Sequence, residues 1–459
     1  MNTQTTTDRP NVIWIFGDQH RAQALGHMGD PNVHTPSIDR MAGDGVTFRN
    51  AVSGNPWCTP FRACLLTSRY PHETCVRTPQ QLDPSIPTVA QPFNEAGYDT
   101  AYFGKWHLDG HPESESRSAF HVVPPERRGG FKTWIGYENN NSQYDCWVHG
   151  HDENGNDVPL RKLPTYETDA LTDLLLDYLD QRDRTGEADG NALAAGQPFF
   201  AVLSVQPPHG PYVAPREFMA RHTPGEIQLR PNVPEQYDIA ETARRQLAGY
   251  YAQIENLDWN IGRVRDALDR LGLADDTHVI FFSDHGDMHG SHACFGKSVP
   301  YEESIRIPFT IAGRIPHYEH RGGRVDAPIN HVDIAPTTLG LCGLDTPDWM
   351  RGFDYSAYRR KDRHCPPPGQ PDSAFLQHNV PKYHSMMLDR TWRGIVTADG
   401  WKYVAVPHQP FMLHNLNDDP FEQVNLAMKH KYRDIRKRLQ DRLAGWIHET
   451  GDEFALPEL

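Results

Sequence analysis

The sequence of 459 residues contains no long apolar run. Its first hydrophobic segment, residues 12–16, is much shorter than the core of a signal peptide. No other stretch approaches the roughly 20 apolar residues of a membrane-spanning helix. Apolar residues make up 38% of the chain and charged residues 23%, the proportions of a globular protein. These features predict a cytoplasmic protein without membrane association.

Basic residues and paired cysteines are scarce as well. Lys and Arg number 45 against 60 Asp and Glu, and the formal net charge of −15 argues against nucleic acid or an anionic membrane as the main partner. The 7 cysteines show no C-x-x-C pairing, so neither a zinc cluster nor a disulfide framework is expected. Histidine is the residue in excess, with 25 copies. Such a surplus points to metal binding, proton transfer or anion binding.

Short β-rich runs alternate with amphipathic stretches along most of the chain. The predicted strands and main helices lie at residues 12–16, 101–103, 199–205 and 279–282, and at 166–181 and 241–271. This alternation predicts an α/β fold in which a large, mostly parallel sheet is sandwiched by helices.

Two regions interrupt that alternation. Residues 111–165 show little periodicity and are predicted to form an elaborated loop region near the substrate site. Residues 365–369 are a proline-rich linker, followed by strand-like segments and a final helix. We therefore expect a catalytic domain over residues 1–365 and a small antiparallel-sheet-plus-helix domain over residues 366–459.

Polar residues follow four of the predicted strands at the points where they end. These residues are Asp18 with Gln19, Lys105 with His107, His209, and Asp284 with His285. Because the carboxyl ends of parallel strands meet at one edge of a sheet, we expect these side chains on one rim. The carboxylates, amide and imidazole favour one divalent cation, although each acidic residue alone is equally consistent with a loop or helix cap.

The segment 58–69 (CTPFRACLLTSR) combines a helix start with a cysteine. Thr59 followed by Pro60 is typical of an N-cap and the first helical position. Cys58 is then expected at the positive end of a helix, where anions and reactive side chains are stabilised. Taken alone, Cys58 is either a low-pKa nucleophile or a structural cysteine.

Residues 58–62 and 66–69 resemble the signature of the type I sulfatases, C-x-P-x-R followed by L-T-G-R. In that family, which belongs to the alkaline phosphatase superfamily, the cysteine is oxidised to Cα-formylglycine. Four further segments are similar to family motifs in the same order: GKWH at 104–107, DHG at 284–286, GK at 296–297 with YEE at 301–303, and the run 413–427. The resemblance implies a hydrolase of sulfuric esters that depends on a formylglycine-generating enzyme for its maturation.

Four positions depart from the family pattern. Phe61 and Ser68 replace the usual Ser and Gly without changing the C-x-P-x-R core. Gln19 and His285 stand where Asp and Asn are commoner, a combination similar to choline-sulfatase-like and phosphonate monoester hydrolase-like members. The resemblance implies Ca²⁺ as the metal, with Mn²⁺ and Mg²⁺ as alternatives, since an imidazole ligand suits Mn²⁺ better than Ca²⁺.

The resemblance also implies a role for each site residue. The implied metal ligands are Asp18, Gln19, Asp284, His285 and the modified Cys58. The geminal diol of the modified residue would attack sulfur and Arg62 would steady it, while Lys105 and Lys297 would neutralise sulfate oxygens. His107 would deprotonate the second hydroxyl to expel sulfate. His209, alone or with Lys297, would protonate the leaving oxygen.

Aromatic and polar residues outside these motifs suit a sugar ring as leaving group. The predicted substrate contacts are Tyr137, Asn140, Trp147, His149, His151 and His378. The acidic composition argues against a long sulfated polymer, so a small sulfated carbohydrate is expected. The alternatives are loop-filling residues with no substrate role, a phosphonate monoester or phosphodiester hydrolase on the same site, and a binding protein whose Cys58 is never converted.

Overall fold

The computed structural model describes residues 9–74, 81–112, 116–182, 196–316, 318, 323–379 and 390–458. Cys75, one of the cysteines in the sequence, lies outside the described residues. Among the helices of these residues, none is long and apolar enough to cross a membrane.

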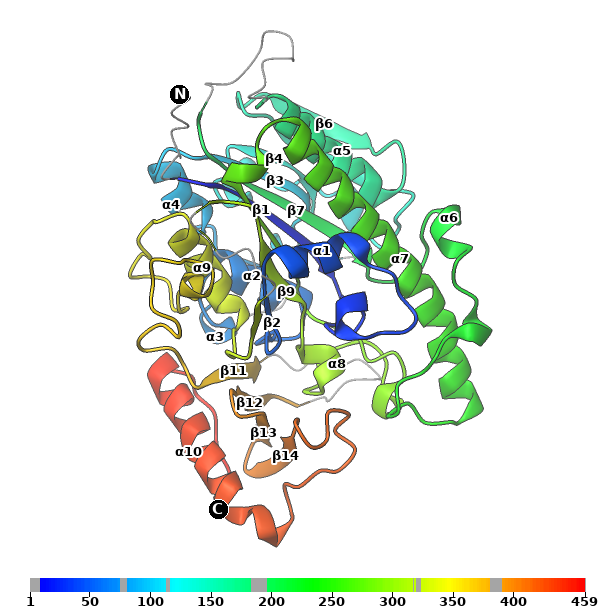
Figure 1. Ribbon diagram of the computed structural model, residues 1–459, viewed down its shortest axis with the longest axis vertical. Helices are drawn as coiled ribbons and strands as arrows, with labels where there is room; N and C mark the ends of the chain where they lie inside the picture. Colours follow the sequence, from blue (N-terminus) through cyan, green and yellow to red (C-terminus); the bar gives the residue numbers. More distant parts are fainter. Residues whose placement is uncertain are drawn as a thin grey trace.

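A ten-stranded sheet runs through the larger part of the molecule, in the order β10-β2-β9-β8-β1-β7-β3-β4-β5-β6 (Figure 1). Its strands are β1 (Asn11–Asp18), β2 (Val46–Phe48), β3 (Asp99–Lys105), β4 (Thr133–Tyr137), β5 (Trp147–His151), β6 (Asp157–Lys162), β7 (Phe199–Pro208), β8 (Thr277–Ser283), β9 (Phe309–Ala312) and β10 (Gly323–Val325). The central strands β8, β1, β7, β3 and β4 are parallel, and antiparallel pairs join them to β9 and β5. The predicted α/β sheet is confirmed.

Strand β1 shows why both faces of this sheet are covered. Val12, Trp14 and Phe16 pack in one hydrophobic cluster, and Ile13 and Ile15 in another, because alternate side chains point to opposite faces. The first cluster includes residues of α2 (Cys58–Thr67), α4 (Ala90–Glu95) and α9 (Ile334–Leu341). The second includes residues of α1 (Pro36–Asp44), α5 (Glu167–Asp180) and α7 (Tyr237–Arg270). A strand buried on both sides reads as a continuous apolar run, as β1 does.

Residues 111–165 are more ordered than the sequence pattern predicts. They contain β4, β5 and β6, which extend the main sheet beyond its parallel centre. The prediction of a loop region is therefore wrong for residues 133–137, 147–151 and 157–162. These strands are short, and β6 is largely exposed, so their side chains carry little hydrophobic periodicity.

A second, four-stranded antiparallel sheet lies at the lower end of the molecule in Figure 1, next to α10 (Arg433–Thr450). Its strands, in spatial order, are β11 (Ser373–His378), β12 (Trp392–Thr397), β13 (Trp401–Val406) and β14 (Gln409–Asn415). Cys64 and Tyr70 from the main body share a hydrophobic cluster with Phe375 and Leu443. The small sheet and helix are as expected, and the boundary between residues 365 and 366 stays a prediction.

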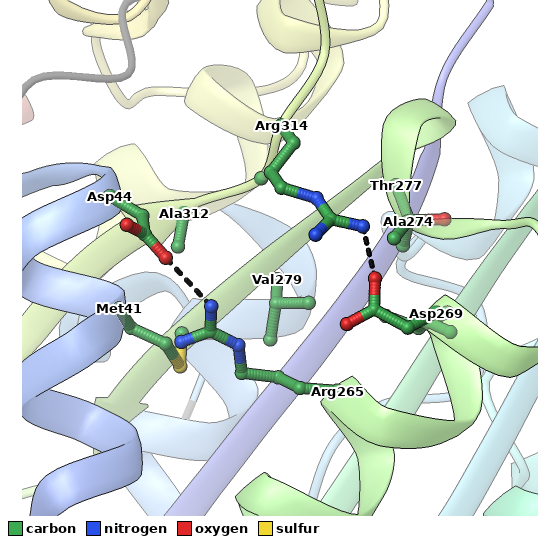
Figure 2. Close-up of a pocket in the computed structure, with 11 residues that line it drawn as sticks. Met41, Asp44, Arg265, Asp269, Ala274, Thr277, Val279, Ala312 and Arg314 are labelled. Atoms are coloured by element: carbon green, nitrogen blue, oxygen red, sulfur yellow. Dashed lines mark hydrogen bonds and ion pairs between the residues drawn. The ribbon is translucent and has the colours of Figure 1, made fainter.

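The remaining short helices are α3 (Pro71–Thr74), α6 (Arg216–Met219) and α8 (Glu302–Ile305). A small cavity of about 40 Å³ lies beside Thr277, at the start of β8 (Figure 2). Two arginines line it, but Arg265 pairs with Asp44 at 2.7 Å and Arg314 pairs with Asp269. These two carboxylates therefore neutralise the arginines that line the cavity.

Candidate active site

Four adjacent parallel strands deliver polar side chains to one edge of the main sheet. Strand β1 ends at Asp18 and β3 at Lys105, while His209 and Asp284 directly follow β7 and β8. Since the order is β8-β1-β7-β3, these four ends are neighbours. The structure thus brings together the side chains that the strand-end pattern predicts on one rim.

Cys58 is the first residue of α2 and lies against this edge. The N-cap is Trp57, so the helix begins two residues earlier than the pair Thr59-Pro60 predicts. The side chain of Cys58 is only 3% exposed, and every residue of α2 is buried. Its Sγ lies 2.9 Å from Lys297 Nζ, 3.3 Å from His285 Nε2 and 3.5 Å from Asp18 Oδ1. The cysteine therefore faces the strand ends.

The ligand atoms of Asp18, Cys58, Asp284 and His285 all lie within 4.8 Å of one another, and all four residues are buried. His285 Nδ1 lies 3.0 Å from the carbonyl oxygen of Gly286, which leaves the Nε2 lone pair facing the cluster. Asp284 Oδ2 is buried and has no hydrogen-bond partner among the described residues. Two carboxylates and an oriented imidazole that face one another at these distances fit a divalent cation.

Three cations surround the acidic residues. Lys105 Nζ lies 2.6 Å from Asp18 Oδ2, and Arg62 reaches Asp18 and Asp284 at 3.5 Å each. Burial raises the pKa of Asp18, but Lys105 and Lys297 outweigh it and hold that pKa well below its ordinary value. Burial lowers the pKa of Lys297, yet nearby Cys58 and Asp18 raise it above its ordinary value. Both groups are therefore charged at neutral pH.

Arg62 is fixed as a rigid donor beneath the cluster. Its Nη1 donates to the carbonyl oxygen of Lys105 and to Ser204 Oγ, both at 2.8 Å. The guanidinium also lies over the ring of Phe16, 5.1 Å from its centroid. These contacts fix the orientation of the guanidinium one helical turn beyond Cys58.

Gln19 is held with its amide in one orientation. Its Nε2 donates to Asp287 Oδ2, while its Oε1 accepts from Lys297 Nζ at 2.9 Å. Its backbone N–H donates to Asp284 Oδ1 at 2.9 Å, and its φ of 74° is in the left-handed region. The oxygen rather than the nitrogen of the amide is thus presented to the site.

The two predicted proton-transfer histidines are both neutral in this structure. Burial, with the charges of Lys105 and Arg62, lowers the pKa of His107 well below its ordinary value. Burial and Lys297 lower the pKa of His209 to about 3. His209 Nδ1 lies 2.7 Å from the carbonyl oxygen of Gly210, which leaves Nε2 as the acceptor. Both side chains can accept a proton at neutral pH.

Sequence patterns missed three residues that hold this site together. Ser204, in β7, accepts from Arg62, and Tyr212 donates to Asp287 at 2.9 Å. Asp287 also accepts from the backbone N–H of Gly296, next to Lys297. The position of Asp287 directly after the DHG motif was the available signal, whereas Ser204 and Tyr212 carry none.

The predicted substrate contacts do not form one surface. Tyr137 is fully buried and donates to Glu167 Oε1 at 2.5 Å, and His149, 1% exposed, accepts from the backbone N–H of Val123. Asn140 and His378 are also buried, while Trp147 and His151 are partly exposed. His378 stacks on Trp57, next to Cys58, with 6.4 Å between ring centroids.

Comparison with known proteins accounts for this arrangement. A model of the sulfatase family matches residues 10–344, and a model of the N-sulphoglucosamine sulphohydrolase C-terminal region matches residues 290–449. An ulvan-active sulfatase of Formosa agariphila is 36% identical, over 98% of this chain and 83% of its own length.

Solved structures share the fold over nearly the whole chain. One, from work on the metabolism of multiple glycosaminoglycans by Bacteroides thetaiotaomicron, has a TM-score of 0.82 and 26% identity, and covers 97% of both chains. The phosphonate monoester hydrolase of Agrobacterium radiobacter has a TM-score of 0.73 at 22% identity, covering 96% of both chains. The second likeness shows the fold alone.

Proposed function

Since the chain belongs to the sulfatase family, we propose that it hydrolyses the sulfate ester of a small sulfated carbohydrate through a formylglycine made from Cys58. One observation carries the proposal: Cys58, at the buried start of α2, lies within 3.5 Å of Asp18, His285 and Lys297. A nucleophile, anionic metal ligands and cations thus meet at one point.

The ligands for one divalent cation are Asp18, Gln19, Asp284, His285 and the modified residue 58. When bound, this cation supplies Lewis-acid polarisation of the sulfate and of the nucleophilic hydroxyl. We favour Ca²⁺, because four of these positions supply oxygen once Cys58 is oxidised. Mn²⁺ and Mg²⁺ are the alternatives, which metal analysis of the purified protein distinguishes.

The surrounding side chains bind the ester and move protons. Lys105 and Lys297 neutralise sulfate oxygens in a buried site, where such contacts are strong. Arg62 orients the hydroxyls at position 58 through its fixed donors. His107, neutral at physiological pH, accepts the proton whose removal releases sulfate.

His209 serves the leaving oxygen. In the free site its pKa of about 3 makes it an acceptor. A bound sulfate ester adds negative charge beside it, and that charge raises its pKa. We therefore infer that His209 takes up a proton with the substrate and donates it from Nε2 to the alkoxide that leaves.

The likeness to an ulvan-active sulfatase supports a carbohydrate sulfate as substrate. Trp147 and His151 offer partly exposed rings, and His378 lies beside Trp57 at the start of α2. The net charge of −15 favours a short substrate over a long polyanion.

Two measurements test the proposal. Mass spectrometry of the tryptic peptide 50–62, after expression with a converting enzyme, is expected to show formylglycine in place of Cys58. The converted protein is then incubated with defined sulfated mono- and oligosaccharides, and free sulfate is measured. An unmodified thiol throughout, or no sulfate release from any of these sugars by the converted protein, would contradict it.

A second candidate activity is the hydrolysis of phosphonate monoesters or phosphodiesters. Gln19 and His285 favour it, since this combination is similar to that of phosphonate monoester hydrolase-like members of the family. Sulfate and phosphonate monoesters of one leaving group are offered in competition. A higher kcat/KM for the phosphonate would establish this activity instead.

A further inference from the structure

Before Cys58 is oxidised, the site holds a different set of metal donors. The sulfur of Cys58, the imidazole of His285 and the carboxylates of Asp18 and Asp284 face one another. Thiolate and imidazole are ligands that Zn²⁺ prefers, whereas Ca²⁺ takes 6–8 oxygen ligands and does not favour sulfur. The unmodified chain thus presents a zinc-type donor set.

The distances fit four-coordinate zinc. Zn–N and Zn–O bonds of ~2.0–2.1 Å and Zn–S bonds of ~2.3 Å place the corners of a tetrahedron roughly 3.3–3.7 Å apart. Cys58 Sγ lies 3.3 Å from His285 Nε2 and 3.5 Å from Asp18 Oδ1. His285 Nε2 lies 3.6 Å from Asp18 Oδ1 and 3.6 Å from Asp284 Oδ1. These four of the six separations between the donors fall within the range of a compact tetrahedron, and the other two are at most 4.8 Å.

The neighbours of these donors also favour a low coordination number. Lys105 Nζ occupies Asp18 Oδ2 at 2.6 Å, which leaves Oδ1 as the single oxygen of Asp18 that faces the cluster. Gly286 fixes the tautomer of His285 in the way that metal-binding imidazoles are usually fixed.

We propose that the unmodified, folded chain binds Zn²⁺ tetrahedrally through Asp18, Cys58, Asp284 and His285. In a chain whose Cys58 was converted before folding, position 58 offers oxygen in place of sulfur, and the site favours a hard cation. The proposal shares its site with the proposed function but does not depend on it, because it concerns the thiol form alone.

The test uses the full-length chain expressed without a converting enzyme, with the thiol verified in peptide 50–62. After dialysis against equal Zn²⁺ and Ca²⁺, we expect one zinc and no calcium per chain. Co²⁺, a spectroscopic substitute for zinc, is expected to give a sulfur-to-cobalt charge-transfer band with intense tetrahedral d–d bands. Preferential binding of calcium by the thiol form would overturn the proposal.

Two variants locate the sulfur. Cys58→Ser is expected to abolish the charge-transfer band and the bound zinc, while Cys365→Ser, at an exposed cysteine, keeps both. A band that persists in Cys58→Ser would assign the metal to another cysteine and overturn the proposal. The converted chain is a control that needs no substitution: it retains the fold, lacks sulfur at position 58 and is expected to show no band. Its sulfate release tests the proposed function separately.

Discussion

At the scale of single residues, the charged side chains of the site are different from those that we propose to transfer protons. Lys105 and Lys297 hold Asp18 ionised at the centre, and burial with the charges of Lys105 and Arg62 keeps His107 neutral. His209 is neutral for similar reasons, with burial as the larger cause. His209 therefore has to take up a proton when the substrate binds. The contribution of His209 to the rate then depends on how much the leaving group needs that proton.

We expect His209→Ala to discriminate between leaving groups. A sugar alkoxide is a poor leaving group and needs a proton, so kcat/KM for a sulfated sugar should fall about 100-fold or more. Nitrophenolate needs none, so kcat/KM for nitrophenyl sulfate should fall less than about 10-fold. Steady-state kinetics on both esters measure the difference, and an equal loss on the two would exclude His209 as the acid.

Asp287 is expected to position Gln19, the proposed metal ligand. In Asp287→Asn one acceptor oxygen becomes a donor, so the amide of Gln19 or the N–H of Gly296 loses its partner. Metal affinity and kcat should each fall about 10- to 100-fold, as for other groups that orient metal ligands. Calorimetric titration with the metal checks this, with the exposed Asp266→Asn as control. Unchanged affinity in Asp287→Asn would show that Gln19 is oriented by other contacts.

At the scale of elements, the first turn of α1 is hydrogen-bonded by a side chain that is distant in the sequence. Helix α1 begins at Pro36 after Thr35, but the side chain of Thr35 makes no capping bond. The carboxylate of Asp258, in α7, accepts from the backbone N–H groups of Ser37 and Ile38 at 3.1 and 2.7 Å instead. A residue more than two hundred positions away thus satisfies the first turn.

We expect Asp258→Ala to destabilise the protein by about 1–2 kcal/mol. The substitution leaves two N–H groups at the start of α1 without a partner, the usual cost of losing a helix cap. Urea unfolding at pH 7 measures the change in the free energy of unfolding. Asp266→Ala, at an exposed position of the same helix, is the matched control, and equal stability of the two variants would contradict the capping role.

At the scale of the whole molecule, part of the histidine surplus lies in the interior. Burial lowers the pKa of several histidines. The value falls to about 4 for His20, His149, His289 and His378, and to about 3 for His209, His331 and His414. Each binds a proton more readily in the unfolded chain, where the pKa is near 6.5. Their contribution to stability is therefore complete above pH 6.5 and is lost as the pH falls toward 3–4.

The protein should accordingly lose stability steeply between pH 6.5 and 4.5. A fully buried histidine contributes about 2 kcal/mol of destabilisation at pH 5. His331 is a clean example, since its Nδ1 accepts from the backbone N–H of Gly54 at 2.7 Å. Unfolding measured from pH 4.5 to 7.5 should show a shallower slope for His331→Gln than for the exposed-site control His364→Gln. Identical slopes would show that His331 does not contribute to the loss of stability at low pH.

The sequence alone predicts those parts of the structure that follow from a local sequence pattern. Apolar runs such as residues 12–16 predict the central strands, and residues that follow strands predict the rim with Asp18 and Asp284, because parallel strands end together. Contacts between distant segments have no such rule. Asp287 with Gln19, Asp258 with α1, and the burial of Tyr137 and His149 depend on how segments pack, which no local pattern encodes.

The complete burial of α2 sets an order of events in the life of the chain. Another enzyme has to enclose Cys58 and its neighbours in its own active site to modify them, and a cysteine 3% exposed in a buried helix offers no access. Any modification of Cys58 therefore precedes the folding of α2 against the sheet. A chain that folds first keeps its thiol for as long as it stays folded, so under the proposed function the fraction of active molecules is decided during biosynthesis.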